Sequence, residues 1–157
     1  LVPVVRNHPA SVDPRIKSNN LLNNVLAMQA ALRHGPYFEA IMRNHRGELA
    51  ECSQSNLFLV KGGTVHTPAL DAGLLAGITR EFVEEVAAEA GTPVVDGVLR
   101  DEDLFGADEA FLTSTSKEIV PIVRVDDRIV GSGAPGPVTT RLLHAYRVKA
   151  RAVAGRS

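Results

Sequence analysis

Apolar residues recur at helical spacing in several stretches of the chain, and each stretch has its own end signals. In the first stretch Leu22 and Val25 mark one face, and Ser18 or Asn19 is the expected N-cap. In the second, Thr79 is the expected N-cap. The predicted helices lie within residues 18–34, 77–91, 100–108 and 133–155.

Runs of β-branched and other apolar residues between these helices predict strands. Gly62 and Gly63 are expected to turn a hairpin, and Asp126 and Asp127 a later pair of strands. Strands and helices mix without a steady β-α-β alternation, so the expected fold class is α+β. The predicted strands lie within residues 37–44, 56–68, 92–99 and 109–131, the last of which is expected to hold two or three.

Composition narrows the classes of partner. The 157 residues carry 17 basic and 18 acidic side chains, for a net charge of −1, and 4% are aromatic with no Trp. This balance favours neither nucleic acid nor an acidic membrane surface. No apolar run has the length needed to cross a bilayer. The single cysteine, Cys52, excludes an intramolecular disulfide, is expected to be a buried small residue, and fits a cytoplasmic protein.

Two charged residues stand at positions that suit a catalytic or cofactor-binding role. Lys17 comes directly before the first predicted helix and is either a solvated side chain or an amine that attacks a carbonyl. Glu51 precedes a polar turn and an apolar strand. It is either an exposed acid or a carboxylate that accepts a proton or holds a cationic ring nitrogen.

Two further stretches suit an anion. "GLLAGITREF" opens a strong helix with a Gly-Ile-Thr turn, whose backbone N–H groups and helix dipole favour a phosphate. "FLTSTSKEIVP" places four hydroxyl residues after an apolar strand. These hydroxyls either form a simple turn or donate to the same phosphate.

The histidines show no metal-ligand spacing and are expected in surface or packing roles; they are His8, His34, His45, His66 and His144. One ligand matches all four polar clusters. Pyridoxal 5′-phosphate has an aldehyde for the amine, a pyridine nitrogen for the carboxylate, and a phosphate for the helix start and the hydroxyl residues.

Five stretches, in order and at fitting spacing, resemble the class IV (fold type IV) pyridoxal-phosphate aminotransferases. This family includes branched-chain and D-amino-acid aminotransferases and aminodeoxychorismate lyase. The resemblance implies the α+β fold of that family, with a mixed sheet or barrel and surrounding helices. The stretches are DPRIKSNNLLNNVLA, GELAECSQSNLFLVKGGTVHTP, GLLAGITREFVEEVA, DEDLFGADEAFLTSTSKEIVPIV and GAPGPVTTRL.

The resemblance also implies roles for particular residues. Lys17 matches the lysine that forms a Schiff base with the cofactor and moves the α-proton, and Glu51 matches the partner of the pyridine nitrogen. Positive potential at the start of the first helix is expected to keep the Lys17 amine available. The other implied positions are Gly77, Ile78, Thr79, Ser114 and Thr115 for the phosphate, Leu75 for one ring face and Asn20 for the 3′-oxygen.

These residues do not decide which substrate the protein uses or which reaction it catalyses. Leu22 stands where branched-chain enzymes often carry a tyrosine, "KSNNLL" is similar to the D-amino-acid type, and the Glu51-Cys52 pair is similar to the lyase. The expected reaction transfers an amino group from a branched-chain or D-amino acid to a 2-oxo acid. The alternatives are a lyase-like β-elimination and a truncated, catalytically silent domain that acts by binding or dimerisation.

The family pattern also has a smaller N-terminal domain. This chain begins with Leu1 instead of Met, about where the connector to that domain would lie. Residues 1–16 are therefore expected to be an interdomain connector, and residues 17–157 the cofactor-binding C-terminal domain. The N-terminal domain is expected to be absent from this chain, and the resemblance implies a homodimer.

Overall fold

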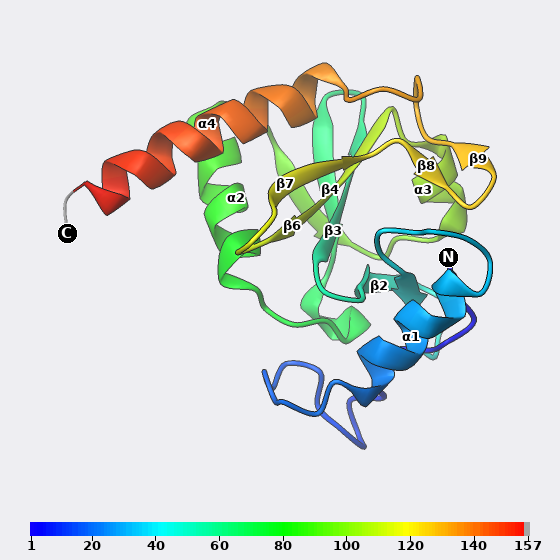
Figure 1. Cartoon of the computed structure of the whole chain (residues 1–157). Helices are drawn as coiled ribbons and strands as arrows, with labels where there is room; N and C mark the ends of the chain where they lie inside the picture. Colours follow the sequence, from blue (N-terminus) through cyan, green and yellow to red (C-terminus); the bar gives the residue numbers. More distant parts are fainter. Residues whose placement is uncertain (156–157) are drawn as a thin grey trace.

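A five-stranded mixed sheet forms the centre of the protein (Figure 1). The computed structural model describes residues 1–155. The strand order is β5-β4-β3-β6-β7, in which only β4 and β5 are parallel neighbours. The strands are β3 (Asn56–Lys61), β4 (Thr64–Pro68), β5 (Val94–Gly97), β6 (Glu109–Ser114) and β7 (Glu118–Ile122).

Two helices cover one face of this sheet, α2 (Ile78–Glu89) and α4 (Pro137–Ala154) (Figure 1). Val83 and Leu142 pack there against the stacked rings of Phe58 and Phe111, whose centroids lie 4.9 Å apart. The apolar stripes of the two helices thus bury a common core with alternate residues of β3 and β6.

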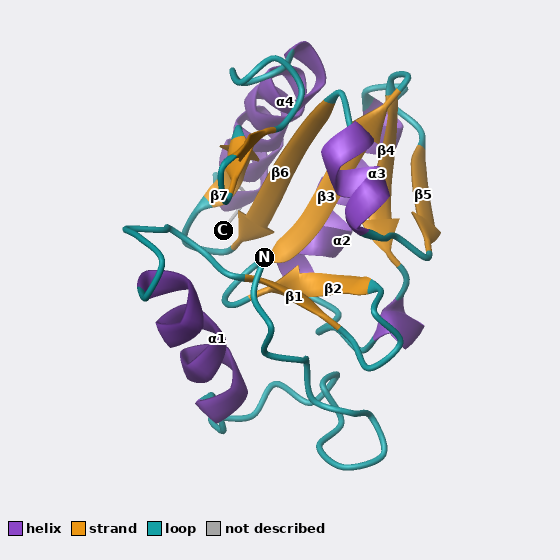
Figure 2. Ribbon diagram, turned by 90° about the vertical axis from the view of Figure 1, so that its right-hand side faces the viewer, coloured by secondary structure: helices purple, strands orange, loops and turns teal. Residues whose placement is uncertain are grey.

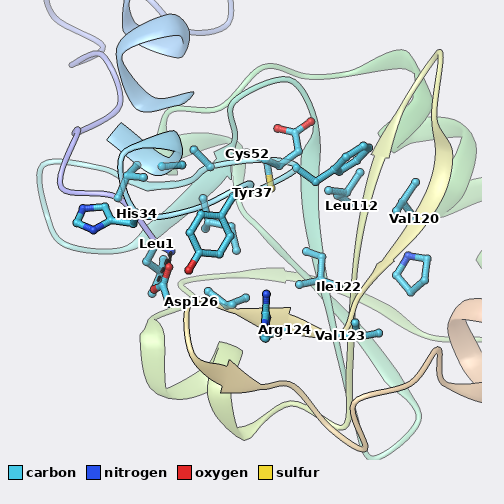
Figure 3. A pocket seen from close by; sticks show the side chains of 18 residues that line it. Leu1, His34, Tyr37, Cys52, Leu112, Val120, Ile122, Val123, Arg124 and Asp126 are labelled. Atoms are coloured by element: carbon cyan, nitrogen blue, oxygen red, sulfur yellow. Dashed lines mark hydrogen bonds and ion pairs between the residues drawn. The ribbon is translucent and has the colours of Figure 1, made fainter. Parts of the chain in front are cut away.

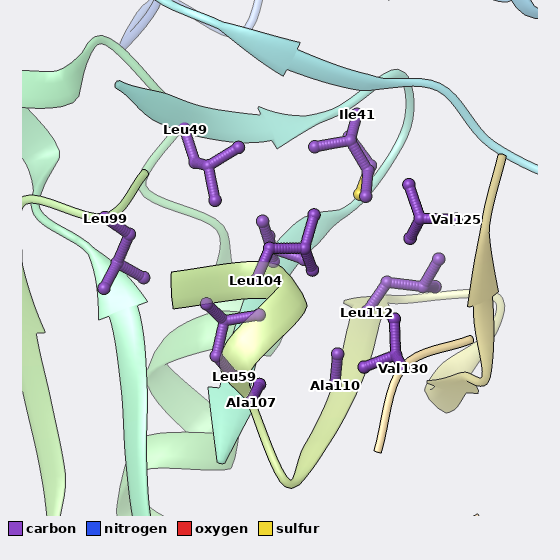
Figure 4. Close-up of a cluster of buried hydrophobic side chains, with 12 residues drawn as sticks. Ile41, Leu49, Leu59, Leu99, Leu104, Ala107, Ala110, Leu112, Val125 and Val130 are labelled. Atoms are coloured by element: carbon purple, nitrogen blue, oxygen red, sulfur yellow. The ribbon is translucent and has the colours of Figure 1, made fainter. Parts of the chain in front are cut away.

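The opposite face is covered by short elements around a second core (Figure 4). Leu104 is fully buried in this core, together with Leu59 and Leu112 from the sheet. The covering elements are β1 (Ile41–Arg43), β2 (Leu49–Cys52), the 3₁₀ turn η1 (Leu70–Ala72) at the rim, α3 (Asp101–Gly106), β8 (Arg124–Val125) and β9 (Arg128–Ile129).

The first helix, α1 (Leu22–Leu32), lies beside β1 and β2, away from α2 and α4 (Figure 2). Its small residues Ala27 and Ala31 pack against Val2 and Met42. The chain's first residues run along β1, since the Val2 and Arg6 N–H groups donate to carbonyls of β1 at 3.1 and 2.8 Å. None of the helices in residues 1–155 has the length and apolar character of a membrane span.

The α+β class and most predicted elements are confirmed. The hairpin turns at Gly62 and Gly63, whose φ values of 56° and 80° fit a type I′ turn. The turn at Asp126 and Asp127 is also present. The barrel is not: within residues 1–155 the five-stranded sheet is open, with β5 and β7 as its edges.

The first helix begins later than predicted, and neither Ser18 nor Asn19 caps it. The preceding backbone forms tight turns instead. The Leu21 N–H donates to the Asn19 carbonyl at 3.0 Å, and the Asn20 N–H donates to the Ser18 hydroxyl at 3.3 Å. Short polar side chains often hold such local turns in place of a first helical turn.

Three other details differ from the sequence prediction. The second helix has Gly77 as its N-cap, and Thr79 lies inside its first turn. The first strand is only three residues long; before it, the Ala40 N–H donates to the Ser53 hydroxyl at 3.3 Å and the Ala40 carbonyl accepts from the Ser53 N–H at 2.8 Å. The segment 109–131 holds four strands, since two short ones, β8 and β9, pair around Asp126.

Candidate functional site

A buried ion pair lies at the centre of the candidate site. Glu51 lies in β2, where four successive residues are buried, and 5% of its surface is exposed. The Arg6 Nε donates to Glu51 Oε1 at 2.6 Å, and the Leu75 N–H donates to Oε2 at 3.1 Å. A second Arg6 nitrogen donates to the Asn23 side-chain oxygen at 3.1 Å. With both oxygens held, the carboxylate has a fixed direction.

The charge state of Glu51 reflects competing influences. Burial raises the pKa of the Glu51 carboxyl, while the Arg6 guanidinium, the Leu75 N–H and the positive charge of Lys17 act in the opposite direction. Lys17 lies 34 positions before Glu51 in sequence, and within residues 1–155 no hydrogen bond or ion pair joins the two side chains.

Leu75 links this carboxylate to the start of α2. While its N–H faces Glu51, its carbonyl accepts from the Asn56 side-chain amide at 3.0 Å. The Asn56 oxygen in turn lies against Gly77, so close that a Cβ at Gly77 would stand 2.3 Å from it. A Cβ at Gly77 would therefore require the Asn56 side chain or the backbone leading into α2 to shift.

The start of α2 and the end of β6 lie side by side, joined through the hydroxyls of Thr79 and Thr115. Gly77 has no side chain to accept from the first N–H groups of α2, and a helix N-terminus carries partial positive charge. The Thr79 and Thr115 hydroxyls lie 3.3 Å apart. The Ser114 hydroxyl is buried and has no hydrogen-bond partner within residues 1–155. A buried hydroxyl without a partner fits a site that an anion completes.

Lys17 and Asn20 lie in the exposed turns before α1. Because α1 begins at Leu22, the explanation that its N-terminus acts on the Lys17 amine loses its premise. The hydrogen bond of Asn20 is local, from its N–H to Ser18. Ile78 is 83% exposed at the first position of α2.

Cys52 lies beside the site but faces elsewhere. It is buried, as predicted, and burial raises the pKa of its thiol well above the ordinary value, which keeps the sulfur protonated. It lines a mostly apolar cavity of about 310 Å³ with Leu112, Tyr37 and Asp126 (Figure 3). None of the candidate site residues lines this cavity.

The histidines form no metal site in the described part of the chain. Among residues 1–155 no group of three or more His, Cys, Asp or Glu side chains is placed to hold a metal ion. The rings of His8 and His45 contact each other with centroids 4.1 Å apart and planes tilted by 50°.

Comparison with known proteins gives the family. Residues 1–125 match the family model described as Amino-transferase class IV, and the chain belongs to this enzyme family. It is 41% identical over 142 residues to the branched-chain-amino-acid aminotransferase of Pseudomonas aeruginosa, covering 90% of this chain and 46% of the relative. It is 44% identical over 135 residues to the D-alanine aminotransferase of Listeria monocytogenes, covering 85% and 45%.

A solved structure agrees. The T.th. branched-chain amino acid aminotransferase with pyridoxamine 5′-phosphate superposes with a TM-score of 0.86 at 32% identity, covering 93% of this chain and 48% of that one. The resemblance found from the five sequence stretches is thereby confirmed. The chain spans about half the length of the relatives it matches.

Two site residues were missed by sequence reasoning. Arg6 is a lone cation in the apolar run LVPVV-R, and Asn56 is a polar residue at the head of an apolar strand. Each is a polar side chain within an apolar stretch, where the hydrophobic pattern predicts burial. A polar residue at a buried position was the signal in the sequence that could have identified them. Their partners, Glu51 and Leu75, are distant in sequence and follow only from the fold.

Proposed function

We propose that this chain forms the cofactor-binding part of a pyridoxal-phosphate-dependent aminotransferase. The observation that carries the proposal is the buried, doubly held Glu51 carboxylate, connected through Leu75 to the anion-binding start of α2. When bound, pyridoxal phosphate supplies an aldehyde that reacts with amines and a ring that accepts the electron pair of the substrate's α-carbon.

The residues fit the parts of this cofactor. Glu51 would hold the protonated pyridine nitrogen, and its Arg6 contact opposes the effect of burial on the pKa of the carboxyl. Lys17 would provide the amine that attaches to the aldehyde and afterwards moves the proton of the α-carbon. Leu75 would pack on one ring face, and Asn20 would hydrogen-bond near the 3′-oxygen.

The phosphate would be held by hydrogen-bond donors from two elements. These are backbone N–H groups of α2 and hydroxyls at the end of β6, including the unpartnered hydroxyl of Ser114. Together these neutral donors would stabilise the phosphate by hydrogen bonds and by the helix dipole. The residues in this role are Gly77, Ile78, Thr79, Ser114 and Thr115.

The reaction that we propose transfers an amino group from a branched-chain or D-amino acid to a 2-oxo acid. The proposal includes assembly as a homodimer and a boundary at Lys17 between an N-terminal connector and the cofactor-binding domain. Residues 1–16 would then lead from a further domain, although the first six of them pack along β1.

The test is borohydride reduction of the 157-residue chain with pyridoxal phosphate, followed by peptide mass spectrometry. We expect a pyridoxyl adduct on Lys17 that is lost in Lys17→Ala and kept in Lys61→Ala, which removes another exposed lysine. An adduct spread evenly over the exposed lysines, or none, contradicts the proposal. Amino transfer to 2-oxoglutarate, compared with pyruvate release from aminodeoxychorismate, separates the transferase from the lyase.

A further inference from the structure

Another buried carboxylate contacts the turn that follows β2. Glu39 stands just before β1, and 5% of its side chain is exposed. Its oxygens accept from the Ser53 hydroxyl at 2.6 Å, the Gln54 N–H at 3.0 Å and the Ser55 hydroxyl at 2.9 Å. All three donors belong to the turn between β2 and β3. We call this turn, residues 53–55, the carboxylate-side turn, because it follows Glu51 by two positions.

The same carboxylate also contacts a turn from another part of the chain. The Lys117 ammonium donates to Glu39 Oε1 and, at 3.3 Å, to the Gln54 side-chain oxygen. Lys117 lies between β6 and β7, and its ammonium also lies 4.9 Å from the centroid of the Phe38 ring. We call residues 114–117 the phosphate-side turn, because they contain Ser114 and Thr115.

Glu39 is therefore the point where these two turns meet. A buried carboxylate with four donors is costly to leave partly satisfied, so each donor depends on the others being in place. We propose that Glu39 is a positioning residue that couples the carboxylate-side turn to the phosphate-side turn. If the proposed function holds, this coupling sets the distance between the groups that hold the pyridine nitrogen and those that hold the phosphate.

Positioning and electrostatics predict different results for two substitutions. Glu39→Gln leaves the Lys117 cation unpaired near the phosphate-side turn, whereas Lys117→Met leaves the Glu39 anion unpaired. If charge alone mattered, the first change would strengthen binding of a phosphate dianion and the second would weaken it. If Glu39 positions the turns, both changes weaken binding.

The experiment compares the 157-residue chain with Glu39→Gln, Lys117→Met and the double variant. The matched control is Glu109→Gln, which alters another buried carboxylate that accepts two backbone N–H groups, at the opposite end of β6. Hydrogen–deuterium exchange is measured on the ligand-free proteins. Dissociation constants are measured for pyridoxal phosphate and for pyridoxal, which lacks the phosphate.

In the ligand-free proteins we expect each single variant to speed exchange in both turns, including the turn that carries no substitution. The double variant is expected to resemble the single ones, because the groups act as one unit. The control is expected to leave both turns unchanged. Faster exchange confined to the substituted residue's own turn overturns the coupling, whether or not the chain binds the cofactor.

For the ligands we expect both single variants to bind pyridoxal phosphate about tenfold more weakly, which is about 1.4 kcal/mol, with a smaller change for pyridoxal. Opposite changes in the two variants, or equal losses for both ligands, overturn the positioning role. If the unsubstituted chain binds neither ligand, the proposed function fails and the exchange data still decide the coupling. Ser55→Ala removes a single donor and replaces Glu39→Gln if the latter does not fold.

Discussion

At the scale of single residues, the site depends on polar groups that burial makes costly. Glu51 is tolerated in the interior because Arg6 and the Leu75 N–H hold its two oxygens. The Asn56 side chain lies so close to Gly77 that a Cβ there would force one of the two to move. Both features depend on a partner that is remote in sequence, so their effects are testable by removing one side of each contact.

Arg6→Met is expected to raise the pKa of Glu51 further, because Arg6 is the main group that opposes the effect of burial. When folding raises the pKa of a carboxyl, the folded protein keeps its full stability at pH values below the ordinary carboxyl pKa. It loses stability as the pH rises above that value. We therefore expect the free energy of unfolding of the variant to fall by about 3 kcal/mol at pH 7 and by less near pH 4. NMR titration of labelled glutamate and urea unfolding at both pH values measure this.

The control is Arg15→Met, which breaks an exposed pair with Asp13 and should change the free energy of unfolding little at either pH. An equal loss of unfolding free energy in the two variants would show that the buried pair stabilises the fold no more than the exposed pair does.

Gly77→Ala is expected to displace either the Asn56 side chain or the start of α2. The Asn56 amide is held by the Leu75 carbonyl, so it cannot swing away without losing that hydrogen bond. Weaker binding of pyridoxal phosphate, by about tenfold, should follow, measured by fluorescence titration. Gly97→Ala is the control, since a Cβ there meets nothing within 4 Å. Unchanged binding in Gly77→Ala would remove the case for a close approach at α2.

At the scale of elements, helix and strand starts are completed by side chains from elsewhere. The first N–H groups of α4 have no cap from their own sequence, because Gly136 precedes Pro137. Glu109, from the start of β6, accepts instead from the Val138 and Thr139 N–H groups at 2.9 and 2.8 Å. This contact attaches the longest helix to the central sheet.

Glu109→Gln is therefore expected to lower the free energy of unfolding by about 1–2 kcal/mol, as loss of an N-cap does. Gly136→Ala should be at least as harmful, since its Cβ would lie 2.0 Å from the Glu109 carboxyl carbon. Urea denaturation followed by circular dichroism measures both. The exposed Glu102→Gln serves as reference, and a reference loss as large as that of Glu109→Gln would refute the capping role.

At the scale of the whole molecule, the central sheet separates two cores, and ion pairs join the outer elements to each other. Arg43 of β1 holds Asp101 of α3, with one guanidinium nitrogen 2.8 Å from the carboxylate. This contact connects two covering elements that are 58 positions apart in sequence. It is therefore sensitive to conditions that protonate carboxylates.

The hydrogen bond from Arg43 lowers the pKa of Asp101. An acid with a lowered pKa contributes stability above its unfolded-state pKa and loses it as pH falls through the folded value. Asp101→Asn is thus expected to destabilise the protein at pH 7, and the difference from the unsubstituted chain should shrink as the pH falls below the ordinary pKa of an aspartate. Thermal unfolding across this range measures it. A difference that persists at the acidic end would assign the effect to packing.

What the sequence determined by itself was local. Residue spacing predicted α2, α4 and the hairpin at Gly62 and Gly63, because helical periodicity and turn chemistry act over a few residues. The order of five motifs predicted the family. The roles of Lys17 and the other site residues stay predictions until the cofactor experiments are done.

Tertiary structure alone decided the rest. The strand order, the open edge of the sheet, the late start of α1, and the pairing of Arg6 with Glu51 depend on contacts between distant residues. A single sequence shows which residues are polar, but not which of them burial will force together. That choice is made by the packing of the two cores, since the free-energy cost of an unpaired buried group exists only once the chain has folded around it.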